Sequence, residues 1–381
     1  WKDAPPEGSE VLDRETRESR GLYADMKAEL GASRGEEKVF DTWMDSSNSN
    51  LFVSGYLNQP DVFERAFPTA IRPQGKEIVR TWLYYTLLKS ALLLDKPGFK
   101  HVWIDGLGMD PWGRKMSKSL GNGIDADSVL ECGAGGKTGS WQVRGPEKSV
   151  KLRANKIGSE CFRLWKACDA QVGDDFHINP EEIESKYFGV LTKLFNVARF
   201  ASQFEVPDQL DFQPQGLPIE DEWILAEFHQ TMDKVQQAWQ NLDIYTATQS
   251  LKTFGTGILP SHWLEMSKSR LYDGDEKAAW TIHRIVRDFM SALSPVCPFF
   301  THYISSTLYG TSAVDVRSFP NLTPENPDLC TLTSDIESFN SETWKTKKSQ
   351  GISLNAPISG VIVPENLQVF QEVFTRMHKL E

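Results

Sequence analysis

Short apolar runs alternate with one helical run between residues 38 and 130. The run VFDTWM at 39–44 predicts a strand or the end of one, and HVWIDGLGM at 101–109 predicts a buried strand that closes in a glycine-rich turn. Residues 76–94 lie between them and carry apolar side chains at helical spacing. A strand, a helix and a strand joined by short links are typical of a parallel α/β layer.

The pattern is helical from about residue 157 to about residue 310. The segment 179–204 opens with Asn179 in an N-cap position, Pro180 at the first helical position and two acidic residues in the first turn. Three more long helical stretches follow, at about 219–242, 244–272 and 276–308. Helices in this order predict an antiparallel bundle whose apolar stripes form its core.

The two ends of the chain carry weaker patterns. Residues 1–38 are polar, contain proline and glycine and show no strong periodicity, so we expect a connective segment there. From residue 321 onward the sequence predicts a polar helix at about 333–349, a strand at 359–363 and a final helix from Pro364. Together these elements would form a small α/β unit at 321–381.

The composition is that of a folded protein. With 381 residues, 40% of them hydrophobic and 24% charged, the chain is long enough for two or three domains. The longest apolar stretch, at 82–94, contains Lys89 and is too short to cross a bilayer, and no signal-peptide pattern opens the chain. We therefore expect a cytoplasmic protein without membrane contact. Five cysteines without a C-x-x-C pair predict free thiols and no structural metal site.

Charge is distributed unevenly along the chain. The net charge of −11 disfavours non-specific binding to nucleic acid. Within the segment 131–156, however, basic residues far outnumber the acids after Gly136: Lys137, Arg144, Lys148, Lys151, Arg153 and Lys156 face only Glu147. This basic insertion predicts either a local contact with an anionic partner or a solvated flexible loop.

The segment GRKMSKSLGN at 113–122 has the residues that a phosphate-binding loop needs. Lys115 and Lys118 are three residues apart and can converge on one anion, and two serine hydroxyls add donors. The flanking Gly113 and Gly121 allow the loop to bend. A given five-residue string such as KMSKS is expected by chance in about one chain of this length in ten thousand.

Two other segments imitate phosphate loops. GAGGKT at 133–138 resembles a Walker loop, but that pattern requires glycine where Glu131 stands, and no convincing buried strand precedes it. EMSKS at 265–269 lacks the first lysine and the flanking glycines and lies within a helical run. We expect neither to bind nucleotide. A Walker-type NTPase would have to depend on Lys137 and not on Lys118.

KMSKS and several further segments resemble the class I aminoacyl-tRNA synthetases of the isoleucine, leucine and valine group. The matching segments are VFDTWMDSS at 39–47, RPQGKEIVRTWLYYTLLKS at 72–90, GLGMDPWGRKMSKSLGN at 106–122, FRLWKA at 162–167, DEWILAEFHQ at 221–230, SRLY at 269–272 and SPVCPFFTHYISSTLYG at 294–310. The resemblance covers roughly residues 39–320. Within the group, residues 72–82 are closest to the valine enzymes.

The resemblance implies a domain order. Residues 39–130 would be the C-terminal half of the class I catalytic Rossmann domain, an α/β fold, and 131–156 an insertion. Residues 157–320 would be an all-α anticodon-binding bundle, followed by the small unit at 321–381. No H-x-G-H element, the usual partner of the lysine loop, occurs in the sequence. We therefore expect a C-terminal portion that needs an N-terminal half and is inactive by itself.

The resemblance also implies roles for individual residues. Lys115 and Lys118 would act on the phosphates of ATP, which is supplied with Mg²⁺. The other residues expected at the nucleotide are Gly75 and Glu77 at the ribose, Met116 near the adenine, and Gly106 and Ser117. Trp43, Asp45 and Trp82 would line the valine pocket. For the tRNA, we expect Lys148, Lys151 and Arg153 near the acceptor stem, and Arg284 and Arg287 in the anticodon-binding bundle.

The expected function follows from this set of motifs. The chain would supply the lysine loop and the anticodon-binding domain of an enzyme that activates valine with ATP and transfers it to tRNA(Val). The alternatives are a non-catalytic tRNA-binding relative and the isoleucine or leucine homologue.

Overall fold

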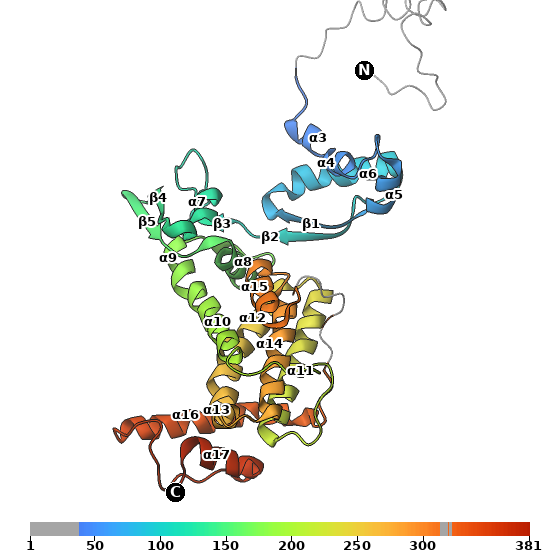
Figure 1. The fold of residues 1–381 in the computed structure, drawn as a ribbon. Coiled ribbons are helices and arrows are strands. Elements are labelled where there is room, and N and C mark those ends of the chain that lie inside the picture. Colours follow the sequence, from blue (N-terminus) through green and yellow to red (C-terminus); the bar gives the residue numbers. More distant parts are fainter. Residues whose placement is uncertain (1–37, 313–318, 320–321) are drawn as a thin grey trace, which may run out of the picture. The chain divides into compact units, whose positions relative to one another are not determined.

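The computed structural model describes residues 38–312, 319 and 322–381 (Figure 1). The expected connective segment at 1–38 therefore lies, except for Lys38, outside the described residues. The described residues divide into two compact units, one made of residues 38–71 and 78–101 and the other of residues 72–77 and the described part of 102–381. The predicted domain boundaries stay a prediction. Among the described residues, no helix is both long and apolar enough to span a membrane.

The first unit is mainly helical. It contains α3 (Thr42–Ser46), α4 (Ser49–Val53), α5 (Pro60–Ala66), a π-helical turn η2 (Val79–Leu83) and α6 (Tyr84–Leu94). The helix predicted at 76–94 is confirmed, with a short 3-10 turn η1 (Lys76–Ile78) at its start. The strand predicted at 39–44 is wrong. The Asp41 side chain accepts a hydrogen bond of 3.0 Å from the Trp43 N–H and so begins helix α3 instead.

Two strands connect the units, and a short parallel pair follows them. Strand β1 (Thr69–Gly75) pairs with β2 (Phe99–Asp105), and β3 (Gly108–Met109) pairs in parallel with β6 (Phe176–His177). The strand predicted at 101–109 is found as β2 and β3, separated by a turn, but it is half-buried and not buried as predicted. Gly106 lies in this turn, and a Cβ atom there would lie 1.7 Å from the Asp174 carbonyl oxygen. Only glycine fits this close approach of two main-chain segments.

The basic insertion is a folded β-hairpin. After α7 (Ala126–Glu131) and a 3-10 turn η3 (Ala134–Gly136), strands β4 (Gly139–Arg144) and β5 (Ser149–Ala154) pair antiparallel. Their side chains alternate, so that Trp141, Val143, Leu152 and Ala154 are buried in the core while the opposite face is exposed. The interpretation of this segment as a flexible solvated loop is therefore wrong.

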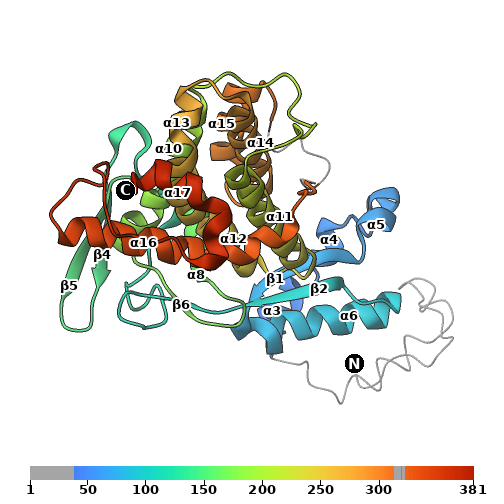
Figure 2. The same cartoon turned by 90° about the horizontal axis from the view of Figure 1, so that it is seen from below.

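The bundle predicted from the helical pattern is confirmed (Figures 1 and 2). Its elements are α8 (Gly158–Asp169), α9 (Pro180–Ile183), η4 (Glu184–Phe188), α10 (Gly189–Ala201), α11 (Ile219–Gln240), α12 (Ile244–Thr253), η5 (Phe254–Trp263), α13 (Leu264–Tyr272), α14 (Glu276–Leu293) and α15 (Pro298–Tyr309). Asn179 caps α9 as expected, since its side chain accepts from the Glu181 N–H at 3.2 Å. The helix predicted at 276–308 is interrupted before Pro298, which begins α15.

A buried ionic cluster joins α11 to α13. Arg270 donates from Nη2 to Asp221 Oδ2 at 2.8 Å and from Nη1 to Glu220 Oε1 at 3.2 Å. Asp221 is fully buried and also accepts from the Trp263 indole N–H at 3.0 Å. Burial raises the pKa of the Asp221 carboxyl to about 6, although the hydrogen bonds from Arg270 act to lower it. The matched segments DEWILAEFHQ and SRLY therefore meet in space at a structural ion pair.

The C-terminal unit is helical, with η7 (Pro327–Leu332), α16 (Thr333–Ser349), η8 (Glu365–Phe370) and α17 (Gln371–His378). Figure 1 shows α16 and α17 at one end of the bundle. The strand predicted at 359–363 is not formed, and the nearest pairing is an isolated bridge between Ile358 and Leu380. Buried Lys347 holds the neighbouring segments together, because its ammonium donates to the carbonyls of Leu354, Ala356 and His378, each at 2.7 Å. An ammonium thus takes up main-chain acceptors in the segment before the expected strand.

Acid should destabilise this C-terminal unit through His378. Its Nε2 lies 2.7 Å from Asn340 Oδ1, and Asn340 in turn contacts His262 at 3.0 Å. Burial, with the nearby charge of Lys347 and then His262, lowers the pKa of His378 from 6.5 to about 4. The native state thus holds this imidazole neutral, so its contribution to stability is complete above pH 6.5 and declines as the pH falls from 6.5 toward 4.

We expect this linkage to remove about 2–3 kcal/mol of unfolding free energy between pH 6.5 and 4.5. Urea unfolding followed across this range, for the natural chain and for His378→Gln, measures it. The variant cannot titrate at this position, so its stability should depend less steeply on pH. Groups such as Asp221 affect both proteins equally. Equal slopes would contradict the assignment.

Candidate functional site

The lysine loop at 113–122 follows β3 directly and folds back on it through a bridge between Met109 and Lys115. Lys115 and Lys118 are both exposed. Within the described part of the chain, neither ammonium forms an ion pair with a carboxylate. Two lysines on an exposed loop without internal counter-ions are available to an anionic ligand.

Asp110 organises the start of this loop. Its fully buried carboxylate accepts from the Trp112 and Arg114 N–H groups at 3.0 and 2.9 Å, and from Arg114 Nε at 2.8 Å. Burial by itself would raise the pKa of Asp110, but the hydrogen bonds from Asn122, Arg114 and Trp112 outweigh it, and the pKa is lowered. A carboxylate with this many donors is held charged and in place.

Asn122 closes the loop from its other end. Its Oδ1 accepts from the Ser117 N–H at 2.9 Å, and its Nδ2 donates to the Lys115 carbonyl at 3.2 Å and to Asp110 at 2.9 Å. The buried amide thus fixes the main chain on each side of Met116 while the lysine side chains remain exposed. Neither Asp110 nor Asn122 was singled out from the sequence, although both lie in the matched segment at 106–122.

Glycines bend the loop at both ends, as the sequence predicted. Gly113 has φ 79° and Gly121 has φ 63°, which is the left-handed region that other residues rarely adopt. Around Gly121 no atom would lie within 4 Å of an added Cβ, so backbone conformation and not space calls for glycine here. These two residues are candidate hinges for the lysines between them.

The residues expected at the nucleotide lie in this second unit, and their role stays a prediction. Glu77 is exposed, and a Cβ atom at Gly75 would lie 2.2 Å from its carboxylate, so the glycine leaves room for that side chain. The Met116 methyl group would lie 3.3 Å from a Cβ at Gly108, which shows that Met116 packs back onto β3. Ser117 Oγ accepts from the Leu120 N–H at 3.2 Å and so helps to shape the turn.

The residues expected at the amino acid lie in the first unit. Trp82 is 5% exposed, and its indole N–H donates to the Ser46 carbonyl at 2.9 Å. Trp43 is half-buried in α3, and Asp45 in the same helix is exposed. The hydrogen bond places Trp82 beside the helix that carries Trp43 and Asp45. The three residues therefore belong to one local structure.

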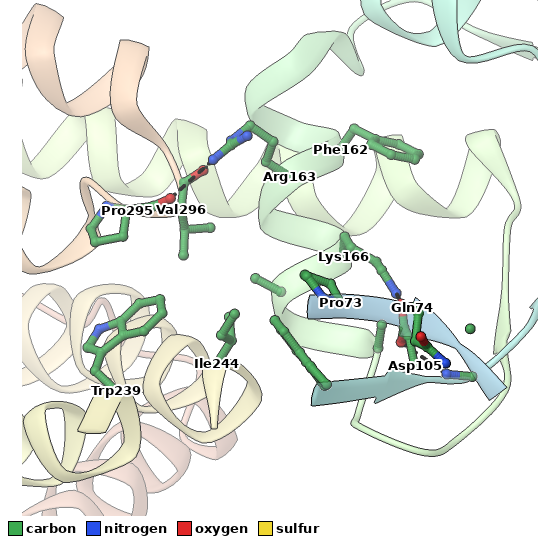
Figure 3. Close-up of a pocket in the computed structure, with 15 residues that line it drawn as sticks. Pro73, Gln74, Asp105, Phe162, Arg163, Lys166, Trp239, Ile244, Pro295 and Val296 are labelled. Atoms are coloured by element: carbon green, nitrogen blue, oxygen red, sulfur yellow. Dashed lines mark hydrogen bonds and ion pairs between the residues drawn. The ribbon is translucent and has the colours of Figure 1, made fainter. Parts of the chain in front are cut away.

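A cavity of about 700 Å³ lies in the second unit beside the ends of β1 and β2 (Figure 3). Gly75 and Gly106 line it, but Lys115 and Lys118 do not, so it is not the phosphate-binding region. An ion pair of 2.6 Å between Lys166 and Asp105 lies in its wall. Burial lowers the pKa of Lys166, and Asp105 opposes that effect. We assign no ligand to this cavity.

The exposed face of the β4–β5 hairpin is basic. Register pairs Ser140 with Arg153 and Gln142 with Lys151 on this face, with Arg144 opposite Ser149. Together with Lys148 in the turn, three residues of the strands form what we call the basic face: Arg144, Lys148, Lys151 and Arg153, all exposed. The only acid in the turn is Glu147. A two-stranded ribbon with four cations on one side presents a surface for a phosphate backbone.

The two arginines expected at the anticodon are engaged within the bundle. Arg284 is 6% exposed and donates to Asp288 at 2.6 Å and to the Leu210 carbonyl at 3.0 Å. We therefore do not retain it as a tRNA contact, because its guanidinium is buried and paired. Arg287 is partly exposed and lies between Asp211 and Asp288, at 2.8 and 3.1 Å. Its role stays a prediction, although both carboxylates would compete with a phosphate.

The two imitations of phosphate loops are structural. Residues 133–138 follow a helix and not a strand, and Lys137 pairs with Glu131 at 2.8 Å. Residues 265–269 lie inside α13, where Lys268 pairs with Glu265 at 3.1 Å. Neither segment has the strand-loop context that a phosphate site requires.

Two family models match successive parts of the chain. Residues 7–179 match the family of tRNA synthetases class I (I, L, M and V), and residues 221–362 match the anticodon-binding domain of tRNA ligase. The first match contains the lysine loop and the hairpin. The second contains most of the helical bundle and α16.

Curated relatives agree over most of the chain. It is 34% identical to a valine-tRNA ligase of Aeropyrum pernix over 91% of this chain and 40% of that protein. It is 33% identical to the valine-tRNA ligase of Saccharolobus solfataricus over 84% of this chain, and 31% identical to that of Pyrobaculum aerophilum over 96%. The chain spans 35–42% of the length of these relatives.

Solved structures share the fold. A ternary LeuRS-tRNA-LeuAMS complex of Agrobacterium radiobacter superposes with a TM-score of 0.57 at 16% identity, over 77% of this chain and 34% of that one. Methionyl-tRNA synthetase of Mycobacterium tuberculosis, bound by methionyl-adenylate, gives a TM-score of 0.52 at 19% identity, over 74% of this chain and 55% of that one. At these identities the likeness concerns the fold alone.

Proposed function

The chain belongs to the class I tRNA synthetases of the isoleucine, leucine, methionine and valine group, and we propose that it supplies the phosphate-binding loop and the anticodon-binding domain of a valine-tRNA ligase. The observation that carries the proposal is the lysine loop itself. Lys115 and Lys118 are exposed on a turn that Asp110 and Asn122 hold from inside, within a chain that matches valine-tRNA ligases over most of its length.

The proposed reaction has two steps. In the first, a carboxylate oxygen of valine attacks the α-phosphorus of ATP, and pyrophosphate leaves with the electrons of the broken P–O bond. Negative charge grows on the β- and γ-phosphates as that bond breaks, and two ammonium groups placed there stabilise it more in the transition state than in bound ATP. In the second, a terminal ribose hydroxyl of tRNA attacks the acyl carbon and AMP leaves.

We propose that Mg²⁺ enters with the nucleotide as MgATP. Among the described residues, no three His, Cys, Asp or Glu side chains are grouped closely enough to hold a metal ion. Mg²⁺ typically binds through substrate phosphates and only one or two carboxylates. In the proposed site Gly75, Glu77 and Gly106 face the adenosine, and Met116 and Ser117 complete the loop beside it.

Valine would be selected by shape in the proposed pocket. Trp43, Asp45 and Trp82 lie in one local structure, and the buried ring of Trp82 has no freedom to move aside for a larger side chain. One methylene changes binding by only about 1–3 kcal/mol, so such a pocket cannot by itself reject threonine and smaller analogues. Cytoplasmic location and the partnership with an N-terminal half stay predictions.

Pyrophosphate exchange tests the proposal. The chain is joined to the part of the Aeropyrum pernix ligase that lies outside the match, giving what we call the complemented enzyme. ATP-pyrophosphate exchange is then measured with valine, isoleucine and leucine in turn. Exchange with valine supports the proposal, and exchange with another amino acid identifies a different member of the group. A folded assembly that binds tRNA but shows no exchange supports a non-catalytic tRNA-binding relative.

The basic face should bind the tRNA backbone. We expect the triple variant Lys148→Ala/Lys151→Ala/Arg153→Ala to bind a tRNA(Val) transcript more weakly, with a salt dependence whose slope falls by about one for each cation removed. Fluorescence anisotropy at several salt concentrations measures both quantities. The control Lys345→Ala/Lys348→Ala/Lys268→Ala changes the net charge equally at exposed positions elsewhere. If both variants lose affinity alike, the effect reflects overall charge and not the basic face.

A further inference from the structure

The hairpin that carries the basic face is bonded to both ends of the lysine loop. The Arg144 N–H donates to the Gly121 carbonyl at 3.1 Å, and the Arg144 carbonyl accepts from the Arg114 guanidinium. Arg114 immediately precedes Lys115, and Gly121 follows Ser119 by two residues. Arg144 of the hairpin therefore contacts the loop on both sides of the two lysines, through the Arg114 side chain before them and the Gly121 main chain after them.

Side-chain packing strengthens this contact. A Cβ atom at Gly145 would lie 3.3 Å from the Trp112 ring, so the hairpin turn rests against the turn that precedes the lysines. The Arg114 guanidinium lies 5.5 Å from the centroid of the same ring while it pairs with Asp110 at 2.7 Å. Arg114 thus connects three groups: the indole, the buried carboxylate and the Arg144 carbonyl.

The other end of the hairpin is bonded to the start of the helical bundle. The Arg153 N–H donates to Glu181 Oε1 and the Lys156 N–H donates to Glu184 Oε2, both at 2.9 Å. Trp141 and Val143 bury the reverse face in the core. The hairpin is therefore a stiff element, whereas the lysine loop has glycine hinges at Gly113 and Gly121 and exposed side chains.

We propose that tRNA bound on the basic face fixes the position of the lysine loop through the main chain of Arg144. The Arg144 side chain is one of the four cations of the basic face, and its main chain is the tether to the loop. Phosphates held by the cations of the basic face restrain the hairpin as a whole. The two hydrogen bonds made by the Arg144 main chain, to the Gly121 carbonyl and from the Arg114 guanidinium, then restrain the loop on both sides of the lysines. Since coupling is reciprocal, a nucleotide that orders the loop also strengthens tRNA binding.

This inference rests on the proposed tRNA contact and extends it to the regulation of the nucleotide site. Hydrogen-deuterium exchange on the 381-residue chain, with and without a saturating tRNA(Val) transcript, measures it. We expect the amides of residues 115–121 to exchange about tenfold more slowly with tRNA, within the range of about 5- to 150-fold that is usual for coupled sites.

Two substitutions at one position separate the tether from the charge. Arg144→Ala removes the cation and keeps the N–H, whereas Arg144→Pro removes both. The Arg144 N–H points to Gly121 and not to β5, so proline removes no bond between the two strands. Both variants should bind tRNA with the same reduced affinity. At saturation, only Arg144→Ala should keep the slow exchange of the loop.

A further variant covers the case in which Arg144→Pro fails to fold. Arg114→Lys keeps the charge beside Asp110 but lacks the forked guanidinium that reaches the Arg144 carbonyl as well, so it too should reduce the protection. Unchanged loop exchange in the natural chain at saturating tRNA would overturn the inference while leaving tRNA binding intact. Equal protection in Arg144→Ala and Arg144→Pro, or in Arg114→Lys and the natural chain, would also overturn it. A chain that binds no tRNA would overturn both the inference and the proposed tRNA contact.

Discussion

Replacement of Arg270 by alanine should lower the unfolding free energy by about 3–5 kcal/mol. The guanidinium is the main partner of Asp221, which is fully buried, and it also contacts Glu220 and Asp275. Removing it leaves a carboxylate in the core without its counter-ion, and the cost of breaking such a pair exceeds the net stability of the intact pair. Urea unfolding of the chain measures the loss.

Two controls distinguish this mechanism from general damage to α13. Lys268→Ala alters an exposed lysine of the same helix and should change stability by no more than about 0.5 kcal/mol. The double variant Asp221→Leu/Arg270→Met removes both charges and should recover much of the loss, because no unpaired charge stays at Asp221. A double variant as unstable as the sum of its two single variants would contradict the account.

Replacement of Lys115 or Lys118 by alanine should slow pyrophosphate exchange by the complemented enzyme about 10²- to 10³-fold, which is typical for the loss of one preorganised group that stabilises transition-state charge. Both ammoniums are exposed and without internal ion pairs among the described residues, so the chain should fold normally without either. The loss should appear in kcat, since charge on the pyrophosphate develops during the reaction.

The chain contains its own matched control for this experiment. Lys268 lies in the imitation EMSKS, within a helix and paired with Glu265. Lys268→Ala should leave exchange unchanged, and so should Lys137→Ala in the imitation of a Walker loop. Loss of exchange in Lys137→Ala together with retained exchange in Lys118→Ala would reverse the assignment.

Local signals in the sequence predicted most of the helices. Asn179 and Pro180 mark the start of a helix by their own chemistry, and the structure confirms both. The prediction at 39–44 was wrong because the same kind of signal was overlooked: Asp41 is a helix cap in front of an apolar run. The hairpin was also missed, although Trp141 and Val143 alternate with polar residues and the turn that follows contains Gly145 and proline.

The hydrophobic and polar pattern of the sequence does not predict contacts between residues that are distant along the chain. The Lys347 ammonium binds carbonyls of two later segments, and no periodicity in the sequence indicates these contacts. The sequence predicts Arg284 as an exposed cation, whereas in the structure it is paired with Asp288 and with the Leu210 carbonyl. Such partners depend on the tertiary fold.

The candidate site divides in the same way. Lys115 and Lys118 were evident, because a rare motif carries its own specificity. Asp110 and Asn122, which hold the motif in place, could not be predicted in the same way. Their hydrogen bond joins residues on the two sides of the loop, and only the folded structure shows it. The basic face is predicted by the charges in the sequence. The hydrogen bond from the Arg144 main chain to Gly121, which connects this face to the lysine loop, is not.

Charging of tRNA tests the central claim most directly, because it requires the lysine loop and the anticodon-binding domain to act on one molecule. Radiolabelled valine, ATP, Mg²⁺ and either tRNA(Val) or tRNA(Ile) are incubated with the complemented enzyme, and acid-precipitable label is counted. The account predicts that valine is attached to tRNA(Val) and not to tRNA(Ile), and that Lys118→Ala slows the reaction about 10²- to 10³-fold. A folded complemented enzyme that binds tRNA(Val) but attaches no valine to it would contradict the account.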